Sequence, residues 1–211
     1  MARTTRPALV LLVRHGKTGT TGQVLPGRAP GLSLADEGRA QAEAVAERIA
    51  GLRRPAAVYS SPLERARETA APIAAAVDRE VTIEEGLNEC DFGAWTGRRL
   101  VDLRRRKDWA RVQGHASGFR FPDGESFGEM QVRMVEAVDG LGRRHPGRTV
   151  VAVSHADPIK AVVSHALGAH LDHFQRVVIA PCSVSALLVG GGNPPIVLAV
   201  NEVGGDLTRL V

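Results

Sequence analysis

An apolar run, ALVLLV, ends at the pair Arg14 and His15, and Gly16 follows directly. Such a run is typical of a buried strand in a parallel sheet. In open α/β sheets, ligands bind at the edge where the strands have their carboxyl ends. A neutral imidazole can act as a nucleophile, and a guanidinium matches phosphate oxygens with its planar N–H donors. Taken alone, a histidine after a strand is more often structural than catalytic, so phosphoryl chemistry at His15 and Arg14 needs support from other segments of the chain.

Three further segments carry residues of the same kind. They are SSPLERARETA over 60–70, LNECDFGAWTG over 87–97 and VVAVSHADPIK over 150–160. Together with VRHG, and in this order, they resemble the histidine phosphatase superfamily (branch 1), which has the phosphoglycerate mutase-like fold. The resemblance extends from about residue 9 to about residue 160. A finer resemblance, carried by VLPGRAPGLSLADEGRAQAEAVAERI and SHADPIKAVV, is to an actinobacterial group named as phosphomutases and phosphatases.

The resemblance implies a role for each residue of a candidate site. His15 would attack phosphorus and form a phosphohistidine that water later hydrolyses. Arg14 and Arg65 would hold the non-bridging oxygens, and His155 would stabilise the group in transfer. Glu89 would protonate the leaving alkoxide and then activate the water.

Some of these assignments have competitors. Asp91 and Glu85 are rivals to Glu89 for the role of the acid. By spacing alone, Arg65 would be a surface residue of a helix, and His155 could be a satisfied core histidine.

Departures from the family pattern occur at three positions. Many members have Glu after the RHG triplet and Asn seven positions after its arginine, where this chain has Lys17 and Thr21. The Thr21 hydroxyl could still donate to phosphate, and Lys17 is either a cation at the pocket mouth or a solvated loop charge. Asp157 stands where small residues are more usual. It either orients a substrate hydroxyl or Arg14, or caps a helix that starts at Pro158. The cap is favoured, because an aspartate just before a proline is a typical helix start.

A basic stretch over 98–107 follows the Glu89 segment. It could form a cationic lid over the site, suited to a substrate with a second anionic group, or a solvated helix face. His165, His170 and His173 do not make a convincing set of metal ligands. The mechanism implied by the resemblance needs no metal, so we expect no metal and no other cofactor.

Alternating strand and helix patterns must position these residues. Strand-like runs cover 9–13, 57–59, 81–84, 149–154, 185–189 and 196–201. Helical patterns cover 34–52, 63–77, 126 to about 146, and 158–168. Asp36 or Ser33 could cap the first helix, and the spacing from Ser126 to Glu129 predicts a capping box. We expect a three-layer α/β/α sandwich with a mostly parallel sheet, and residues 1–211 as a single domain.

The composition limits the kinds of partner that the protein can bind and the cellular compartment in which we expect it. The chain is 44% hydrophobic but only 4% aromatic, so Ala, Val and Leu must fill the core. Its net charge of +4 is modest, no nucleic-acid-binding motif appears, and the apolar N-terminal run is too short for a signal peptide or membrane span. Cys90 and Cys182 have no CxxC spacing. We therefore expect a cytoplasmic protein that binds neither nucleic acid nor a membrane, and leave open a homodimer through the last strand or the helix after Pro158.

The predicted function is hydrolysis of a small-molecule phosphate ester. The compact segment around Glu89 looks more like the phosphatases of the family than its glycolytic mutases. We expect a metal-independent phosphomonoesterase acting on a small, polyhydroxylated metabolite phosphate such as a sugar phosphate. The alternatives are a phosphomutase that uses the same intermediate, a catalytically weak phosphoester-binding protein and, last, an RNA-binding protein.

Overall fold

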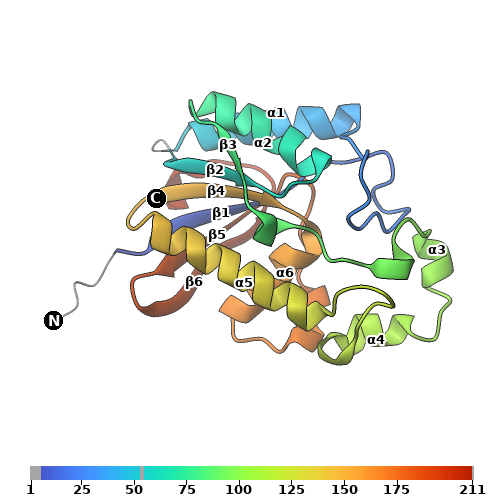
Figure 1. The fold of residues 1–211 in the computed structure, drawn as a ribbon. Coiled ribbons are helices and arrows are strands. Elements are labelled where there is room, and N and C mark those ends of the chain that lie inside the picture. The colour runs from blue at the N-terminus through green and yellow to red at the C-terminus, as the bar shows by residue number, and fades with distance from the viewer. Residues whose placement is uncertain (1–5, 53–54, 211) are drawn as a thin grey trace.

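A six-stranded sheet forms the centre of the computed structural model, which describes residues 6–52 and 55–210. The strand order is β3-β2-β4-β1-β5-β6 (Figure 1). The strands are β1 (Ala8–Arg14), β2 (Ala57–Ser60), β3 (Val81–Ile83), β4 (Thr149–Ser154), β5 (Val184–Gly190) and β6 (Asn193–Glu202). Strands β1 to β4 run parallel, and β5 pairs antiparallel with both of its neighbours. The prediction of a mostly parallel sheet is confirmed.

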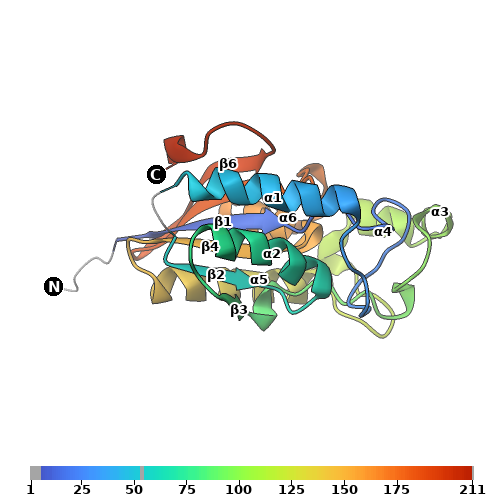
Figure 2. The same ribbon diagram turned by 90° about the horizontal axis from the view of Figure 1, so that it is seen from above.

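Helices cover both faces of the sheet. On one face lie α1 (Asp36–Ala50) and α2 (Glu64–Ala76), and on the other lie α5 (Phe127–Arg144) and α6 (Ala156–Ala166) (Figure 2). Two short helices, α3 (Leu100–Leu103) and α4 (Trp109–Gly114), lie beyond one end of the sheet (Figure 1). Short 3₁₀ helices are η1 (Glu85–Leu87), η2 (Gly93–Trp95), η3 (Ala116–Gly118), η4 (Leu171–Arg176) and η5 (Thr208–Leu210). The three-layer prediction is therefore also confirmed.

Strand register brings the two candidate histidines together. β1 and β4 are neighbouring parallel strands, and their register pairs Leu9 with Thr149 at one end and Arg14 with Ser154 at the other. His15 and His155 each follow the last residue of these strands, so they leave the sheet at the same edge. The sequence patterns placed both strands correctly, but only the pairing shows that their ends are level.

Three hydrophobic clusters make up the core. Those on the two faces of the sheet are built mainly from Ala, Val, Leu and Ile, as the composition predicted. The third lies under α3 and α4 and contains all five phenylalanines, with Trp95 inside it and Trp109 packed against it. Its phenylalanines are Phe92, Phe119, Phe121, Phe127 and Phe174. The few aromatic residues therefore support the region that covers the strand ends.

Two helix starts test the predicted caps. The capping box is confirmed, because the Ser126 side chain accepts from the Glu129 backbone N–H while the Glu129 side chain accepts from that of Ser126. The predicted caps of α1 are wrong, because Ala35 occupies the N-cap and makes no side-chain cap. The Ala35 N–H instead donates to the carbonyl of Lys17 over 2.9 Å. This helix start is thus tied to the loop that follows His15.

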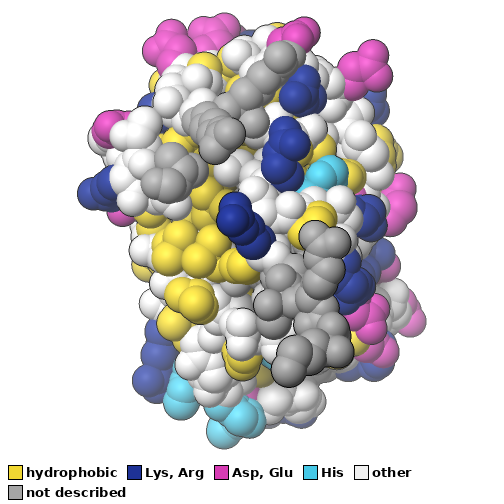
Figure 3. All heavy atoms as spheres, turned by 90° about the vertical axis from the view of Figure 1, so that its left-hand side faces the viewer, with side chains coloured by type: hydrophobic (Ala, Val, Ile, Leu, Met, Phe, Trp, Pro, Cys, Tyr) yellow, Lys and Arg dark blue, Asp and Glu magenta, His cyan; other side chains and the backbone are white. Residues whose placement is uncertain are grey.

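None of the helices in residues 6–52 and 55–210 combines the length and apolar character needed to cross a membrane. Figure 3 shows the end of the molecule away from α3 and α4. Lys and Arg side chains lie across the middle of this face next to a hydrophobic patch, whereas Asp and Glu side chains lie at its margins.

Candidate active site

A cavity of about 460 Å³ opens where β1 and β4 end. Its walls come from the loop over 18–26, from α3 and α4, from the start of α6 and from the segment over 175–179. Arg14, His15, Thr21 and Glu89 line it. Arg65 and His155 are fully buried and lie behind this lining. Their contacts, described below, join them to His15 and Glu89.

His15 is buried and held by both ring nitrogens. Its Nδ1 lies 2.7 Å from the carbonyl oxygen of Gly16, and its Nε2 accepts from Arg65 Nε over 3.3 Å. Burial, and after it the charges of Arg65 and Arg14, lower the pKa of His15 to about 3. The imidazole is therefore neutral near pH 7. A neutral imidazole has a lone pair available on one nitrogen, which nucleophilic attack requires.

Gly16 lets the loop after His15 pack closely against α1. A Cβ atom at Gly16 would lie 2.5 Å from the carbonyl oxygen of Gly38, and one at Gly38 would lie 2.0 Å from that of Lys17. The Gly16 N–H also donates to Thr69 Oγ1 over 3.0 Å. These contacts fix the carbonyl of Gly16 and, through it, the ring of His15.

Arg14 and Arg65 are both turned inward. Arg14 Nη1 donates to the carbonyl of Ile179 over 2.7 Å, and Arg65 Nη2 donates to that of Gly27 over 2.8 Å. Arg14 Nε and Arg65 Nη1 are buried and have no hydrogen-bond partner. The SPLER segment thus places Arg65 in the interior, against the surface position that its spacing alone would suggest.

His155 meets His15 edge to face, with ring centroids 5.1 Å apart. Its Nε2 lies 2.8 Å from Ser61 Oγ, while Nδ1 has no hydrogen-bond partner and lies 3.9 Å from Glu89 Oε2. Burial, then the charges of Arg65 and His15, hold the pKa of His155 well below its ordinary value. Sequence reasoning missed Ser61, although it stands in the SSPLER segment that identified Arg65.

Glu89 is buried beside these groups. Burial and then the charge of Asp157 raise the pKa of Glu89 to about 7, and Arg65, the Cys90 N–H and Arg14 oppose that rise. The Cys90 N–H donates to Glu89 Oε1 over 3.0 Å. A carboxyl with this pKa can both give and take a proton near neutral pH.

The two rivals of Glu89 for the role of the acid, Glu85 and Asp91, do not line the cavity. Glu85 is exposed in η1, and Asp91 Oδ1 accepts from the Gly93 N–H over 3.0 Å within its own turn. The geometry therefore favours Glu89 among the three carboxyls.

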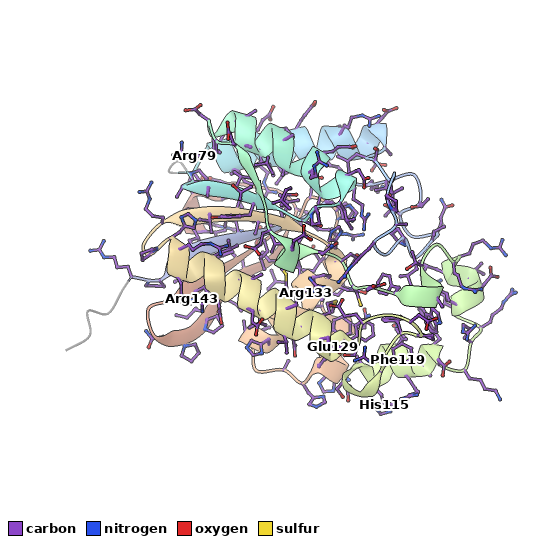
Figure 4. The ribbon with its side chains drawn as sticks, viewed as in Figure 1. Arg79, His115, Phe119, Glu129, Arg133 and Arg143 are labelled. Atoms are coloured by element: carbon purple, nitrogen blue, oxygen red, sulfur yellow. The ribbon has the colours of Figure 1, made fainter. Side chains whose placement is uncertain are left out.

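Arg133 holds the backbone that carries Glu89. It projects from α5 toward this segment (Figure 4), and its guanidinium donates to the carbonyls of Gly86 at 2.7 Å, Asn88 at 3.0 Å and Glu89 at 3.2 Å. It also pairs with Glu125, with 2.9 Å between Nε and Oε1. No local pattern in the sequence singles out Arg133, because the carbonyls that it holds in the Glu89 segment lie more than forty positions earlier in the chain.

The two departures in the loop after His15 differ in position. Thr21 lines the cavity, and its Oγ1 accepts from the Thr18 N–H over 2.9 Å. Its Oγ1 also lies 3.1 Å from Thr18 Oγ1, where either hydroxyl can be the donor, and a hydroxyl can rotate to donate its proton to a ligand instead. Lys17 does not line the cavity, and its Nζ pairs with Glu37 on α1 at 2.6 Å. Lys17 is therefore a charge of the surface loop and not a cation at the pocket mouth.

The arginines and the lysine of the basic stretch over 98–107 are exposed, and among them Arg104 lines the cavity. Arg99 pairs with Asp102, and the Arg106 guanidinium lies 5.3 Å from the centre of the Trp95 ring. The cationic lid is thus reduced to one side chain.

The favoured role of Asp157 as a helix cap is wrong. His155 is the N-cap of α6, which begins at Ala156, so Asp157 lies inside the first turn. Its side chain lines the cavity and binds Lys160 instead.

Across the described ranges 6–52 and 55–210, no group of three or more His, Cys, Asp or Glu side chains is arranged to hold a metal ion. His170 lies 3.4 Å from Asp172, and His115 approaches the same carboxylate at 4.0 Å.

Comparison with known proteins gives a consistent family relationship. The model of the histidine phosphatase superfamily (branch 1) matches residues 10–202. The phosphoserine phosphatase 1 of Hydrogenobacter thermophilus is 31% identical over 170 residues, which cover 78% of this chain and 79% of that protein. The bifunctional protein Rv2228c of Mycobacterium tuberculosis is 34% identical over 201 residues, 94% of this chain but 55% of that protein. The chain thus spans about half the length of this relative.

A solved structure shares the fold over nearly its whole length. A phosphoserine phosphatase mutant from Entamoeba histolytica, in complex with phosphoserine, superimposes with a TM-score of 0.83 and is 26% identical. The match covers 93% of this chain and 98% of that one. The fold is therefore that of the phosphoglycerate mutase-like phosphatases, as the sequence motifs predicted.

Proposed function

This chain belongs to branch 1 of the histidine phosphatase superfamily, and on that premise we propose that it is a metal-independent phosphomonoesterase. It hydrolyses a small metabolite phosphate, such as a sugar phosphate, through a phosphohistidine on His15. The names of two of its relatives, both phosphoserine phosphatases, support phosphate ester hydrolysis as the reaction.

One observation carries this proposal. Three buried nitrogen atoms around the two histidine rings have no hydrogen-bond partner in the protein, namely Arg14 Nε, Arg65 Nη1 and His155 Nδ1. An unsatisfied buried donor costs about 1–3 kcal/mol, more for charged groups, so several such donors gathered at one place are typical of a ligand site. A phosphoryl group offers three acceptor oxygens and negative charge, which two guanidiniums and an imidazole N–H match.

The first step forms the covalent intermediate. Arg65 Nε gives up its hydrogen bond to His15 Nε2 and donates to a phosphoryl oxygen instead. The freed lone pair of Nε2 attacks phosphorus, the bond from phosphorus to the ester oxygen breaks, and Glu89 gives its proton to that oxygen. Arg14, Arg65 and the N–H of His155 hold the non-bridging oxygens as charge develops on them.

The second step returns the enzyme to its starting state. Glu89, now a carboxylate, takes a proton from the attacking water as the water oxygen bonds to phosphorus and the bond to His15 breaks. Inorganic phosphate leaves, and Glu89 is protonated again. Its pKa of about 7 suits both directions of proton transfer.

A phosphomutase with the same intermediate is the second candidate, and the finer resemblance of the sequence favours it. A mutase would keep the phosphohistidine from water and return the phosphoryl group to the substrate. A catalytically weak phosphoester-binding protein would keep the donors around His15 but release no phosphate.

Release of inorganic phosphate from a panel of phosphate monoesters, with EDTA present, tests the proposal. Wild type is compared with His15→Ala, and with His170→Ala as a control histidine whose side chain is 65% exposed. We expect release by wild type and by His170→Ala and its collapse in His15→Ala. Activity that EDTA abolishes, or that survives in His15→Ala, would contradict the proposal. Transfer between positions without release would identify the mutase.

We extend the proposal to location and assembly. Cys90 and Cys182 are free and buried, which supports a reducing compartment such as the cytoplasm. Of the two surfaces considered for a homodimer, α6 buries most of its apolar residues in the core, whereas Ile196 and Leu198 on the edge strand β6 are exposed. A homodimer, if formed, would use β6.

A further inference from the structure

A second polar cluster lines the cavity apart from the residues assigned to phosphate. Lys160 Nζ lies 3.0 Å from Asp157 Oδ1 and 2.9 Å from Gln175 Oε1. The Asp157 and Lys160 side chains are only 18% and 17% exposed, and all three residues line the cavity. Asp157 and Lys160 share one face of α6, and Gln175 reaches them from η4. In the mechanism above, none of the three contacts the reacting atoms, although the charge of Asp157 helps to raise the pKa of Glu89.

Counting hydrogen bonds shows what the cluster can still bind. An ammonium group has three donors, and those of Lys160 that the structure satisfies go to Asp157 and Gln175. One Lys160 donor, both amide N–H groups of Gln175 and the second carboxylate oxygen of Asp157 are left for a ligand. The cluster can therefore donate and accept at adjacent points.

Charge limits the kind of group that fits there. The carboxylate of Asp157 and the ammonium of Lys160 already neutralise each other. An ammonium or carboxylate on the substrate would compete with that ion pair, at a cost in desolvation. Among the described residues that line the cavity, the cations are Arg14, which the first phosphate uses, Lys160, which is paired with Asp157, and Arg104, which is exposed at the cavity wall. Neutral hydroxyls, each both donor and acceptor, use the free positions without breaking the pair.

The rest of the cavity favours a ring. Leu100, Trp109 and Val112, from α3 and α4, form part of its wall, together with Val177 and Val178. Ligand pockets commonly combine such apolar walls with a few polar groups that fix orientation. The C–H face of a cyclic polyol can pack on this wall while its hydroxyls point to the polar cluster.

We propose that Asp157, Lys160 and Gln175 determine specificity by binding adjacent hydroxyls of a phosphorylated sugar or other cyclic polyol. This inference rests on the proposed function for the position of the phosphate, at His15. Asp157 lies two residues after His155, so a residue that binds the phosphate and a residue that binds a hydroxyl are close neighbours in the chain. A substrate is thus held at its phosphate and at its hydroxyls.

Binding to the His15→Ala chain tests the inference without requiring turnover. The probes are ribose 5-phosphate and glucose 6-phosphate, their 2-deoxy counterparts, phenyl phosphate and O-phospho-L-serine, measured by calorimetry. Lys160→Met and Gln175→Met remove the polar groups while keeping similar volume. The double variant Asp157→Asn with Lys160→Met removes both charges together, so that no lone charge is left beside Glu89. Lys107→Met, an exposed position outside the cavity, is the matched control.

We expect at least one sugar phosphate to bind roughly tenfold more tightly than its deoxy counterpart, because one charge-assisted hydrogen bond is lost. The Lys160→Met, Gln175→Met and double variants should remove that difference and leave phenyl phosphate binding within about twofold of the parent chain. Lys107→Met should change nothing.

Two results would overturn the inference. One is that the variants of Asp157, Lys160 and Gln175 weaken the binding of all esters equally, or do not weaken the binding of any. The other is tightest binding of phosphoserine with dependence on Lys160, which would assign the cluster to an amino-acid group. If discrimination appears but wild type hydrolyses no ester, the proposed function fails and the hydroxyl recognition stands. If hydrolysis occurs without discrimination, only the inference fails.

Discussion

Arg65 Nε lies 3.3 Å from Nε2 of His15, and this contact fixes the tautomer of the imidazole. A guanidinium can only donate, so Nε2 must be the accepting nitrogen. The ring proton then sits on Nδ1 and is donated to the carbonyl of Gly16 at 2.7 Å. The lone pair of Nε2 thus faces the guanidinium that also carries an unpartnered Nη1. The hydrogen bond between Arg65 and His15 therefore positions both the nucleophilic nitrogen and the guanidinium that binds the phosphate.

The pH dependence of kcat/KM should report Glu89 on its alkaline side. The acid must be protonated to donate, so activity is lost as pH rises through about 7, the pKa that burial and Asp157 produce. The pKa of His15, about 3, keeps the nucleophile neutral over the working range. In the bound state, the phosphate charge raises the pKa of Glu89 further, so the alkaline limb of kcat should lie above that of kcat/KM.

Glu89→Gln should lower kcat by about 10²–10⁴-fold, the usual contribution of a general acid. The alkaline limb should disappear from what activity remains. A variant that keeps the limb would show that another group titrates there, and Asp91→Asn is the matched control because its carboxyl serves only a local turn.

Glu89 should also make the fold less stable at higher pH. Its pKa in the folded protein lies above the ordinary value of 4.5, so the folded state binds more protons between that value and about 7. Stability must therefore decrease as pH rises through this interval. Glu89→Gln should be more stable than wild type by about 3 kcal/mol at pH 8 and equal to it at pH 4. Denaturant unfolding at both pH values measures this difference, and an equal difference at both would refute it.

Ser61→Ala should weaken catalysis through His155. With Nδ1 of His155 as the donor to phosphate, Nε2 must accept from the Ser61 hydroxyl 2.8 Å away. Losing that hydrogen bond leaves the tautomer unfixed and should lower kcat/KM by roughly tenfold. The alkaline limb, which belongs to Glu89, should not move. A Ser61→Ala variant with full activity would show that His155 needs no such partner.

Gly16→Ala should damage both the fold and the site. The added Cβ would meet the carbonyl oxygen of Gly38 at 2.5 Å, and a backbone atom cannot move aside as a side chain would. We expect a loss of about 1–3 kcal/mol in the free energy of unfolding. We also expect a fall in kcat, because the Gly16 carbonyl orients His15. Gly19→Ala, where a Cβ meets nothing within 4 Å, is the control.

Much of the fold could be predicted from local patterns. The apolar runs identified every strand of the sheet to within about three residues at each end. Strand ends also indicated His15 and His155, because the polar residue after a buried strand is visible in the sequence. The level alignment of those two ends was not visible, since it depends on the pairing of β1 with β4.

The missed features depend on contacts between distant segments. Arg133 reaches the Glu89 segment from α5, and Gln175 reaches Lys160 from η4. Asp157 was interpreted from its local position before proline, but the helix starts at Ala156, two residues earlier than predicted, and Asp157 lines the cavity. Local pattern predicts elements, whereas such side-chain partners follow from packing.

Trapping the covalent intermediate tests the central claim most directly. The chain is mixed with the best ester of the panel, quenched in alkali within milliseconds, and digested for mass spectrometry, because phosphohistidine survives alkali and is lost in acid. We predict one phosphorylated residue, His15, formed and consumed at rates that account for turnover. Phosphate release with no phosphorylated His15 at any time, or phosphorylation at another residue, would contradict this account.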